Sequence, residues 1–293
     1  MATQVWKALQ AVLDGVLTGS LYSLIGMGMA LIFGVMRIVN FAHGAFMMLG
    51  MYVAFEVFDH LGVSPYVGFL AAAAVLFAIG FLAYRGLLRR ISEQSDFMQI
   101  LLTLGMAQMI IGGATLGFSG DFRQVNLPIR SVIYRAGPHI AVNAGDLLAT
   151  GIAVVLAVGM FLFVMKTRFG RALRAIAQNR YAASLIGIDV QRTQAIAFGL
   201  GLAAVGLAGG LLLPPFYLYP EVGGQFTLKS FVIVVLGGMG SIEGAAIAGL
   251  VLGVIESLTS LYWGNQWAVV VEFVIFLLVL SLRPAGLFGR QRV

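Results

Sequence analysis

The sequence has no cysteine and few charged residues. A Cys count of 0 excludes disulfides, thiolate metal sites and a cysteine nucleophile. Asp, Glu, Lys and Arg together make up 10% of the 293 residues, whereas a globular domain carries about 25%. Hydrophobic residues account for 60% of the chain. This balance indicates an integral membrane protein.

Motifs for nucleotide binding and catalysis are also missing. The sequence contains no Gly-x4-Gly-Lys-Ser/Thr phosphate loop, so it cannot bind ATP in that way. His60 and His139 fall in predicted outer loops, away from His43, and the sequence therefore predicts no metal cluster. No Ser-His-Asp triad and no pair of carboxylates can be placed on one surface. Catalysis by this chain is not expected.

Glycine is abundant and proline is scarce. The chain has 38 Gly and 7 Pro, a combination that favours close packing of membrane helices over disorder. The net charge of +6 could indicate a nucleic-acid partner. However, the basic residues lie in short loops between apolar runs, where the positive-inside rule accounts for them. No nucleic-acid partner is expected.

Long apolar runs define the predicted spans, since a membrane-spanning helix needs about 20 mostly apolar residues. The sequence predicts spans near 12–35, 64–88, 98–118, 145–166, 193–216 and 266–282, with a shorter apolar piece near 44–58. The run 226–259 is too long for one span and is interrupted by Gly237, Gly238, Gly240 and Gly244. We therefore predict an all-α integral membrane protein, a polytopic bundle of about eight transmembrane helices in one domain (1–293), with broken or re-entrant segments near 36–58 and 226–259.

The loop 166–192 predicts the sidedness of the chain. Its only acid is Asp189, and its basic residues are Lys166, Arg168, Arg171, Arg174, Arg180 and Arg192. Short loops rich in Lys and Arg stay in the cytoplasm, and the tail with Arg283, Arg290 and Arg292 is expected there too. An even number of crossings must separate these two regions, so 226–259 contributes either two crossings or none. The loop 119–144 and the N-terminus then lie outside.

Polar residues in the first span form one candidate stripe. Asp14, Thr18 and Tyr22 are spaced i, i+4, i+8 and share a helix face. The stripe could face a substrate pathway. Alternatively, Asp14 sits at the membrane interface and Thr18 bonds its own backbone.

Two further pairs of polar residues are pathway candidates. Asn40 and His43 lie in the broken segment at the inner end of the first span, where a packing role is an equal alternative. Gln99 and Thr103 share a face of the span 98–118, where hydrogen bonds between helices would explain them as well.

Ionisable residues within apolar runs are candidates for function, because a charge in the bilayer is costly. Glu256 and Glu272 lie toward the outer ends of their predicted helices, and we interpret them as structural. Lys229, also near an outer end, could snorkel to the interface or pair with an acid. Glu243 lies in the glycine turn near the inner face, where it could contact the first span or a coupling surface.

The loop 166–192 contains a predicted amphipathic helix. Arg171, Arg174 and Gln178 fall on one helical face, and Leu173 and Ile176 fall on another. Such a helix would lie beneath the membrane. It could serve only to orient the protein, or it could offer a surface on which a soluble partner pushes.

Three segments resemble permeases of the branched-chain amino acid ABC importers, the LivH type. They are 31–44 (LIFGVMRIVNFAHG), 168–175 (RFGRALRA) and 235–245 (VLGGMGSIEGA). In addition, Ala182-Ala183 followed by Gly187 resembles the Glu-Ala-Ala loop of ABC-importer permeases, which docks into a groove of the ATP-binding subunit. This sequence departs from that pattern because Tyr181 stands where the pattern has Glu. Permeases for urea and short amides share much of the resemblance.

The resemblance implies a non-enzymatic transport subunit, multi-pass, in the inner membrane of a bacterial type of cell. It implies a second homologous permease, two cytoplasmic ATP-binding subunits and an extracytoplasmic substrate-binding protein as partners. No cofactor is expected in this chain, and ATP-Mg would bind the partner subunits. Coupling to the ATPase is expected at Arg168, Arg171, Arg174, Tyr181, Ala182, Ala183 and Gly187. The helix break is expected at Gly237, Gly238, Gly240, Glu243 and Gly244.

Three other functions stay open at this point. One is a urea or short-amide permease of the same family, another is a self-contained secondary transporter or channel, and a third is a sugar permease of a related family. The outer loop 119–144, which carries Asp121, Arg123 and Arg130, could dock a binding protein through charge pairs or could be a solvated loop.

Overall fold

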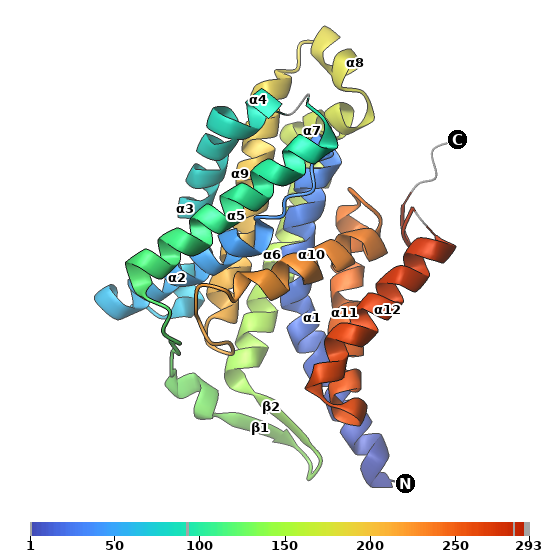
Figure 1. Cartoon of the computed structure of the whole chain (residues 1–293). Coiled ribbons are helices and arrows are strands. Elements are labelled where there is room, and N and C mark those ends of the chain that lie inside the picture. Colours follow the sequence, from blue (N-terminus) through green and yellow to red (C-terminus); the bar gives the residue numbers. More distant parts are fainter. Residues whose placement is uncertain (1, 92–93, 284, 290–293) are drawn as a thin grey trace.

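The computed structural model describes residues 2–91, 94–283 and 285–289, and these form a helical bundle (Figure 1). Seven of the described helices are long and apolar enough to cross a membrane. The predicted all-α polytopic fold is confirmed. In chain order the helices are α1 (Ala2–Met36), α2 (His43–Leu61), α3 (Pro65–Ala83), α4 (Arg89–Ile91), α5 (Asp96–Phe118), α6 (Ala144–Lys166), α7 (Arg168–Gln178), α8 (Arg180–Leu185), α9 (Val190–Leu212), α10 (Gly223–Gly237), α11 (Ile242–Trp263) and α12 (Asn265–Leu282).

Helix α1 is the centre of the bundle and packs against α9, α10 and α11. Glycines let the backbones approach closely along the α1–α11 contact. A Cβ atom placed on Gly19 would lie 2.9 Å from the carbonyl oxygen of Gly249, and one placed on Gly15 would lie 2.6 Å from the Cα of Val254. Small residues at such contacts are typical of membrane helices. The glycine excess therefore serves helix packing, as predicted.

The two broken segments meet at α10. After α1 the chain turns back through the non-helical residues 37–42, and α2 begins at His43 (Figure 1). Gly44 in the first turn of α2 packs against Gly223 at the start of α10, and Gly244 in the first turn of α11 packs against Gly237 at its end. Two Gly-Ala pairs thus hold the two ends of α10.

Helices α10 and α11 are two separate helices joined by the turn 238–241, one of the two arrangements that the sequence allowed for 226–259. Helix α10 has 15 residues, a length of about 22 Å at about 1.5 Å per residue. The hydrocarbon core of a bilayer is about 30 Å thick, so α10 does not cross it unaided. The segment 213–222 that precedes it is not helical.

Side-chain caps divide the loop 166–192 into helices. Thr167 accepts a hydrogen bond from the Gly170 amide at the start of α7, and Asn179 accepts one from the Ala182 amide at the start of α8, both at 3.0 Å. Asp189, the only acid of the loop, caps α9. Such caps satisfy amide groups that a helix start leaves free. The predicted amphipathic helix with Arg171, Arg174 and Gln178 is α7, and α8 follows it as a second short helix.

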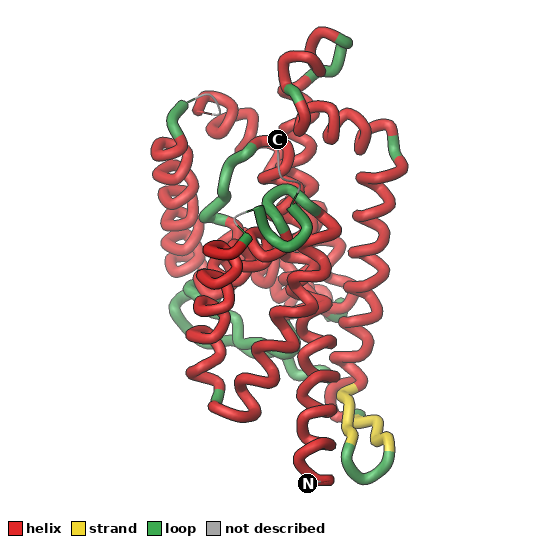
Figure 2. The backbone as a smooth tube through the Cα atoms, turned by 90° about the vertical axis from the view of Figure 1, so that its right-hand side faces the viewer, coloured by secondary structure: helices red, strands yellow, loops and turns green. Residues whose placement is uncertain are grey.

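The outer loop 119–144 contains a small antiparallel hairpin that the sequence did not predict. Its strands are β1 (Ile133–Ala136) and β2 (Ile140–Asn143). Arg130 pairs with Asp146 at 3.0 Å and so joins the loop to α6. The hairpin and the N-terminus lie at one end of the bundle, and α7 and α8 lie at the other (Figures 1 and 2).

Helix ends differ from the predicted spans in both directions, because apolar length indicates which part of a helix can lie in a membrane and not where the helix begins or ends. Helix α1 begins at Ala2, well before the predicted start at 12, and α9 ends at Leu212, before the predicted end at 216. Arg283 follows α12 directly, whereas Arg290 and Arg292 of the predicted cytoplasmic tail lie outside the described residues.

Candidate functional site

Helix α7 lies against α1, α6 and α9. Leu173 and Ile176 are buried in this contact, as the amphipathic pattern predicted. Arg171 is exposed, whereas Arg174 is partly buried and its guanidinium donates a hydrogen bond to the carbonyl oxygen of Val164. The two arginines predicted on one face therefore have different surroundings. Arg171 is free to contact a partner, and Arg174 ties α7 to the end of α6.

Helix α8 projects farthest from the bundle at this end (Figure 1). It carries exposed apolar side chains: Tyr181 is 73% exposed, Leu185 70% and Ile186 75%. Ala183 is buried beneath them, and Gly187 follows with a positive φ of 85° that ends the helix. We call the three exposed side chains the α8 tip. Clustered apolar side chains on a surface mark sites of protein contact.

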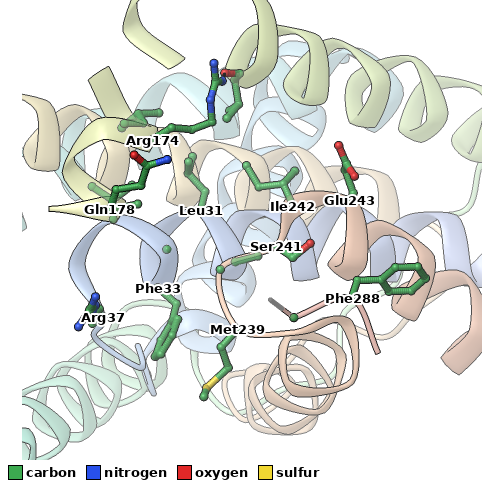
Figure 3. A pocket seen from close by; sticks show the side chains of 18 of the residues that line it. Leu31, Phe33, Arg37, Arg174, Gln178, Met239, Ser241, Ile242, Glu243 and Phe288 are labelled. Atoms are coloured by element: carbon green, nitrogen blue, oxygen red, sulfur yellow. Dashed lines mark hydrogen bonds between the residues drawn. The ribbon is translucent and has the colours of Figure 1, made fainter. Parts of the chain in front are cut away.

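A pocket of about 1060 Å³ opens beside α7 (Figure 3). It lies between α7, the inner end of α1, the turn 238–241 and the segment 285–289. Its polar lining comes from Arg37, Arg174, Gln178, Ser241 and Glu243. Two of the residues predicted at the break between α10 and α11 therefore line this pocket. Gly240 and Glu243 line it, while Gly237 and Gly244 pack against each other behind it.

A buried charge cluster joins the four helices α1, α10, α11 and α12. Lys229 of α10 lies 2.5 Å from Glu256 Oε1 of α11 and 3.3 Å from Glu272 Oε1 of α12. Its ammonium group also donates to the hydroxyl of Tyr22 in α1 at 3.1 Å and lies 4.6 Å from that ring's centroid. A lysine buried in this way needs anionic partners, and it has two.

The predicted polar stripe of α1 leads to this cluster. Asp14 is exposed and accepts a hydrogen bond from Gln10 at 2.8 Å. Thr18 is half-buried, and Tyr22 is buried against Lys229. The stripe therefore runs from the outer surface to the charged interior. Whether substrate follows it stays a prediction.

Asn40 and His43 are fully buried at the start of α2. The Oδ1 atom of Asn40 accepts from the Ala42 amide at 3.1 Å, and the Nε2 atom of His43 lies 3.1 Å from the Ile25 carbonyl oxygen. Within the described chain, Asn40 Nδ2 and His43 Nδ1 have no hydrogen-bond partner. Buried polar groups are normally paired, so these two atoms keep Asn40 and His43 as pathway candidates.

Gln99 and Thr103 are buried on one face of α5. Gln99 donates to the Gln94 carbonyl at 3.1 Å, and Thr103 donates to the Ile100 carbonyl at 3.0 Å. Both bonds are local to the chain around α5. The geometry gives these two residues a local role and adds no support for a pathway.

The sequence indicated that Lys229 could pair with an acid but not that α1, α10, α11 and α12 meet at it. The signal for this cluster in the sequence is that Lys229, Glu256 and Glu272 are ionisable residues in otherwise apolar runs. The link between Tyr84 and Gln194 was missed altogether. The Tyr84 hydroxyl donates to Gln194 Oε1 at 2.7 Å, and Gln194 Nε2 donates to the Val35 carbonyl at 3.3 Å. This link holds α9 to the inner end of α1.

An all-helical multi-pass body with ionisable residues in its interior, broken helices and an exposed apolar tip has the features of a membrane transport protein. The family model described as "Branched-chain amino acid transport system / permease component" matches residues 11–280. The chain belongs to this family and is a multi-pass inner-membrane protein.

Several curated relatives align over nearly the whole chain. The high-affinity branched-chain amino acid transport system permease protein LivH of Escherichia coli (strain K12) is 33% identical over 100% of this chain and 99% of its own length. BraD of Pseudomonas aeruginosa, a permease protein of the same description, is 29% identical over 99% of this chain and 98% of its own. LivM of Escherichia coli is 25% identical over 93% of this chain and 68% of its own. No solved structure shows significant similarity.

Proposed function

We propose that the chain is the transmembrane permease subunit of an ABC importer for branched-chain or other hydrophobic amino acids. Family membership and the names of the relatives support the substrate class. The observation that carries the coupling role is the α8 tip, which exposes Tyr181, Leu185 and Ile186 at the end of the bundle opposite the N-terminus. ATP and Mg would bind partner subunits, because the sequence has no phosphate loop.

In this proposal the α8 tip inserts into a groove of an ATP-binding subunit. The small side chain of the exposed Ala182 keeps this part of α8 narrow, and the exposed Arg168 and Arg171 on α7 supply charge for docking. Helix α7 contacts α1, α6 and α9. Movement of the tip would therefore pass to three spans at once. Nucleotide shifts the pathway only as far as the ATPase prefers one arrangement of this chain.

The remaining partners follow from the same proposal. The pathway would be completed by a second homologous permease, and a LivM relative is named as a permease of the same kind of system. An extracytoplasmic binding protein would deliver substrate to the outer loop, where Arg123 and Arg135 give positive charge. A urea or short-amide substrate would use the same architecture, so substrate competition separates these alternatives.

The buried charge cluster favours a second candidate, a self-contained secondary transporter. Such a carrier needs buried ionisable groups to couple an ion, and Lys229, Glu256 and Glu272 are buried or partly buried. The two candidates differ in what moves substrate. A permease subunit needs ATP and its partners, whereas a secondary transporter works alone on an ion gradient.

The deciding experiment is uptake of radiolabelled leucine into liposomes. The chain would be reconstituted alone and together with a second permease, ATP-binding subunits and a binding protein from the same organism. We expect ATP-dependent uptake only in the complex, with leucine competing far better than urea or acetamide. Uptake by the chain alone under an ion gradient would contradict the proposal.

A pair of variants tests the tip in the same complex. Ile186→Asp places a carboxylate on the exposed tip and should abolish transport. Val5→Asp, at a site of similar exposure at the opposite end of the molecule, is the matched control and should not. Equal transport by both variants would remove the tip from the mechanism.

A further inference from the structure

The pocket beside α7 has two chemically different parts. Leu31, Val35, Val164, Met239 and Phe288 contribute apolar surface. The charged groups lie on two sides, with Ser241 between them (Figure 3). In Figure 3, Arg37, Gln178 and Arg174 lie toward one side and Glu243 toward the other.

Arg37, Arg174 and Gln178 carry donors on one side of the pocket. One guanidinium nitrogen of Arg174 already donates to the Val164 carbonyl oxygen, which leaves its other N–H groups for a ligand. Arg174 and Gln178 are four residues apart on α7 and therefore share a helix face. Arg37 follows the last residue of α1, and within the described residues no hydrogen bond or ion pair engages its guanidinium. A guanidinium offers several donors in a fixed plane, which suits carboxylate and phosphate oxygens.

The backbone at Arg37 supports a ligand-binding role. Arg37 has a φ of 57°, in the left-handed region that glycine prefers. Such a residue often closes a helix, and glycine would do so with less strain. Arg37 is exposed and lines the pocket, so its charge is accessible to a ligand there.

We propose that the pocket binds an amphipathic anion. The acid group would lie against Arg37, Arg174 and Gln178, and the apolar body against Leu31, Val164 and Met239. Glu243 sits on the opposite side and would repel the acid group. This orients the ligand. The proposal concerns this chain alone and does not depend on the importer function.

Two sources could supply such a ligand. One is an anionic lipid of the inner leaflet, since basic pockets between helices on the cytoplasmic side hold lipid headgroups. The other is a hydrophobic amino acid from the cytoplasm, which carries a carboxylate and an apolar side chain. Small-molecule pockets measure about 300–1,000 Å³, and at about 1060 Å³ this one has room for the larger, lipid-derived ligand.

Binding is tested on the purified full chain. Phosphatidylglycerol is titrated and followed by native mass spectrometry, with phosphatidylcholine as the uncharged comparison, and L-leucine is titrated by calorimetry. Arg37→Gly removes the guanidinium and suits the backbone, so it should fold at least as well as the parent. Arg90→Gln, an exposed arginine that is not among the pocket residues, is the matched control.

We expect saturable binding of phosphatidylglycerol that Arg37→Gly weakens about tenfold or more, because a charge-assisted hydrogen bond is lost. Met239→Trp should weaken it by filling the pocket, and Arg90→Gln should leave it unchanged. Saturable leucine binding with the same variant pattern supports the pocket and assigns the amino acid as source. If neither probe binds, or if Arg37→Gly and Arg90→Gln weaken binding equally, the proposal is wrong.

Discussion

Removing the ammonium group from the buried charge cluster is the most informative change to the fold. Lys229→Met keeps a long, flexible side chain and deletes the charge that lies 2.5 Å from Glu256 Oε1 and 3.3 Å from Glu272 Oε1. The two carboxylates would then face each other without a cation between them. The contacts among α10, α11 and α12 would lose the group that neutralises their shared centre.

The magnitude follows from the burial of the two acids. Breaking a buried ion pair by removing one partner costs about 3–5 kcal/mol. Glu272 is 3% exposed and bears the full cost. The Glu256 side chain is 22% exposed, so water screens part of its share. We expect Lys229→Met to lower the free energy of unfolding by about 3 kcal/mol.

A double-mutant cycle separates the pair from general damage. Glu272→Gln alone should destabilise less than Lys229→Met, because Glu256 still balances the lysine. The double variant should be more stable than the sum of the single effects predicts, with a coupling energy of about 1–3 kcal/mol.

The assay is denaturant unfolding of the purified chain in detergent, followed by tryptophan fluorescence, for the parent and three variants. Two results would refute the reasoning. One is a Lys229→Met variant as stable as the parent, and the other is strict additivity of the two substitutions. Either result would mean that the three side chains do not form a cluster in the folded protein.

The remaining predictions concern glycines in the helices and one buried hydrogen-bonded glutamine. Gly44→Ala should destabilise the fold by about 2 kcal/mol or more, because the added methyl would overlap the carbonyl oxygen of Gly223. Gly112→Ala has open space around it and should be neutral or stabilising by up to about 1 kcal/mol. Gln194→Leu should cost about 1–3 kcal/mol, because it removes the buried hydrogen bonds that Gln194 makes with the Tyr84 hydroxyl and the Val35 carbonyl oxygen.

These predictions are checked by the same unfolding assay. Equal effects of alanine at positions 44 and 112 would contradict the close α2–α10 contact. If Gln194→Leu is as stable as the parent, the hydrogen bonds of Gln194 to Tyr84 and Val35 do not stabilise the fold and the proposed link is wrong.

Most of the fold was accessible from the sequence because the bilayer restricts the choice. Apolar length predicted the spans, and the glycines at 237–244 predicted the break between α10 and α11. Local residues also indicate the division of 166–192 into α7 and α8, because Thr167 and Asn179 are residue types that cap helix starts. Such a cap is easily missed within a segment that is expected to be one helix. The hairpin of β1 and β2 carries no strong pattern, since all four residues of β1 are exposed.

The candidate site was less predictable because it depends on contacts between distant segments. Lys229 and Glu272 are far apart in the chain, and no local pattern indicates that they meet. Helical spacing correctly placed Leu173 and Ile176 on a buried face, yet it could not show that Arg174 turns back to Val164. The exposure of Leu185 at the α8 tip also follows from three-dimensional arrangement alone.

The central claim is that the α8 tip is cytoplasmic and is moved by an ATP-binding subunit. The chain has no cysteine, so Ile186→Cys gives a single, unique thiol on the exposed tip. In right-side-out vesicles of the assembled transporter, a membrane-impermeant maleimide should fail to label it. A bifunctional crosslinker that enters the vesicle should join it to an ATP-binding subunit, with a yield that changes between nucleotide-free and ATP-bound states. Labelling from outside, or no crosslink in either state, would contradict the account.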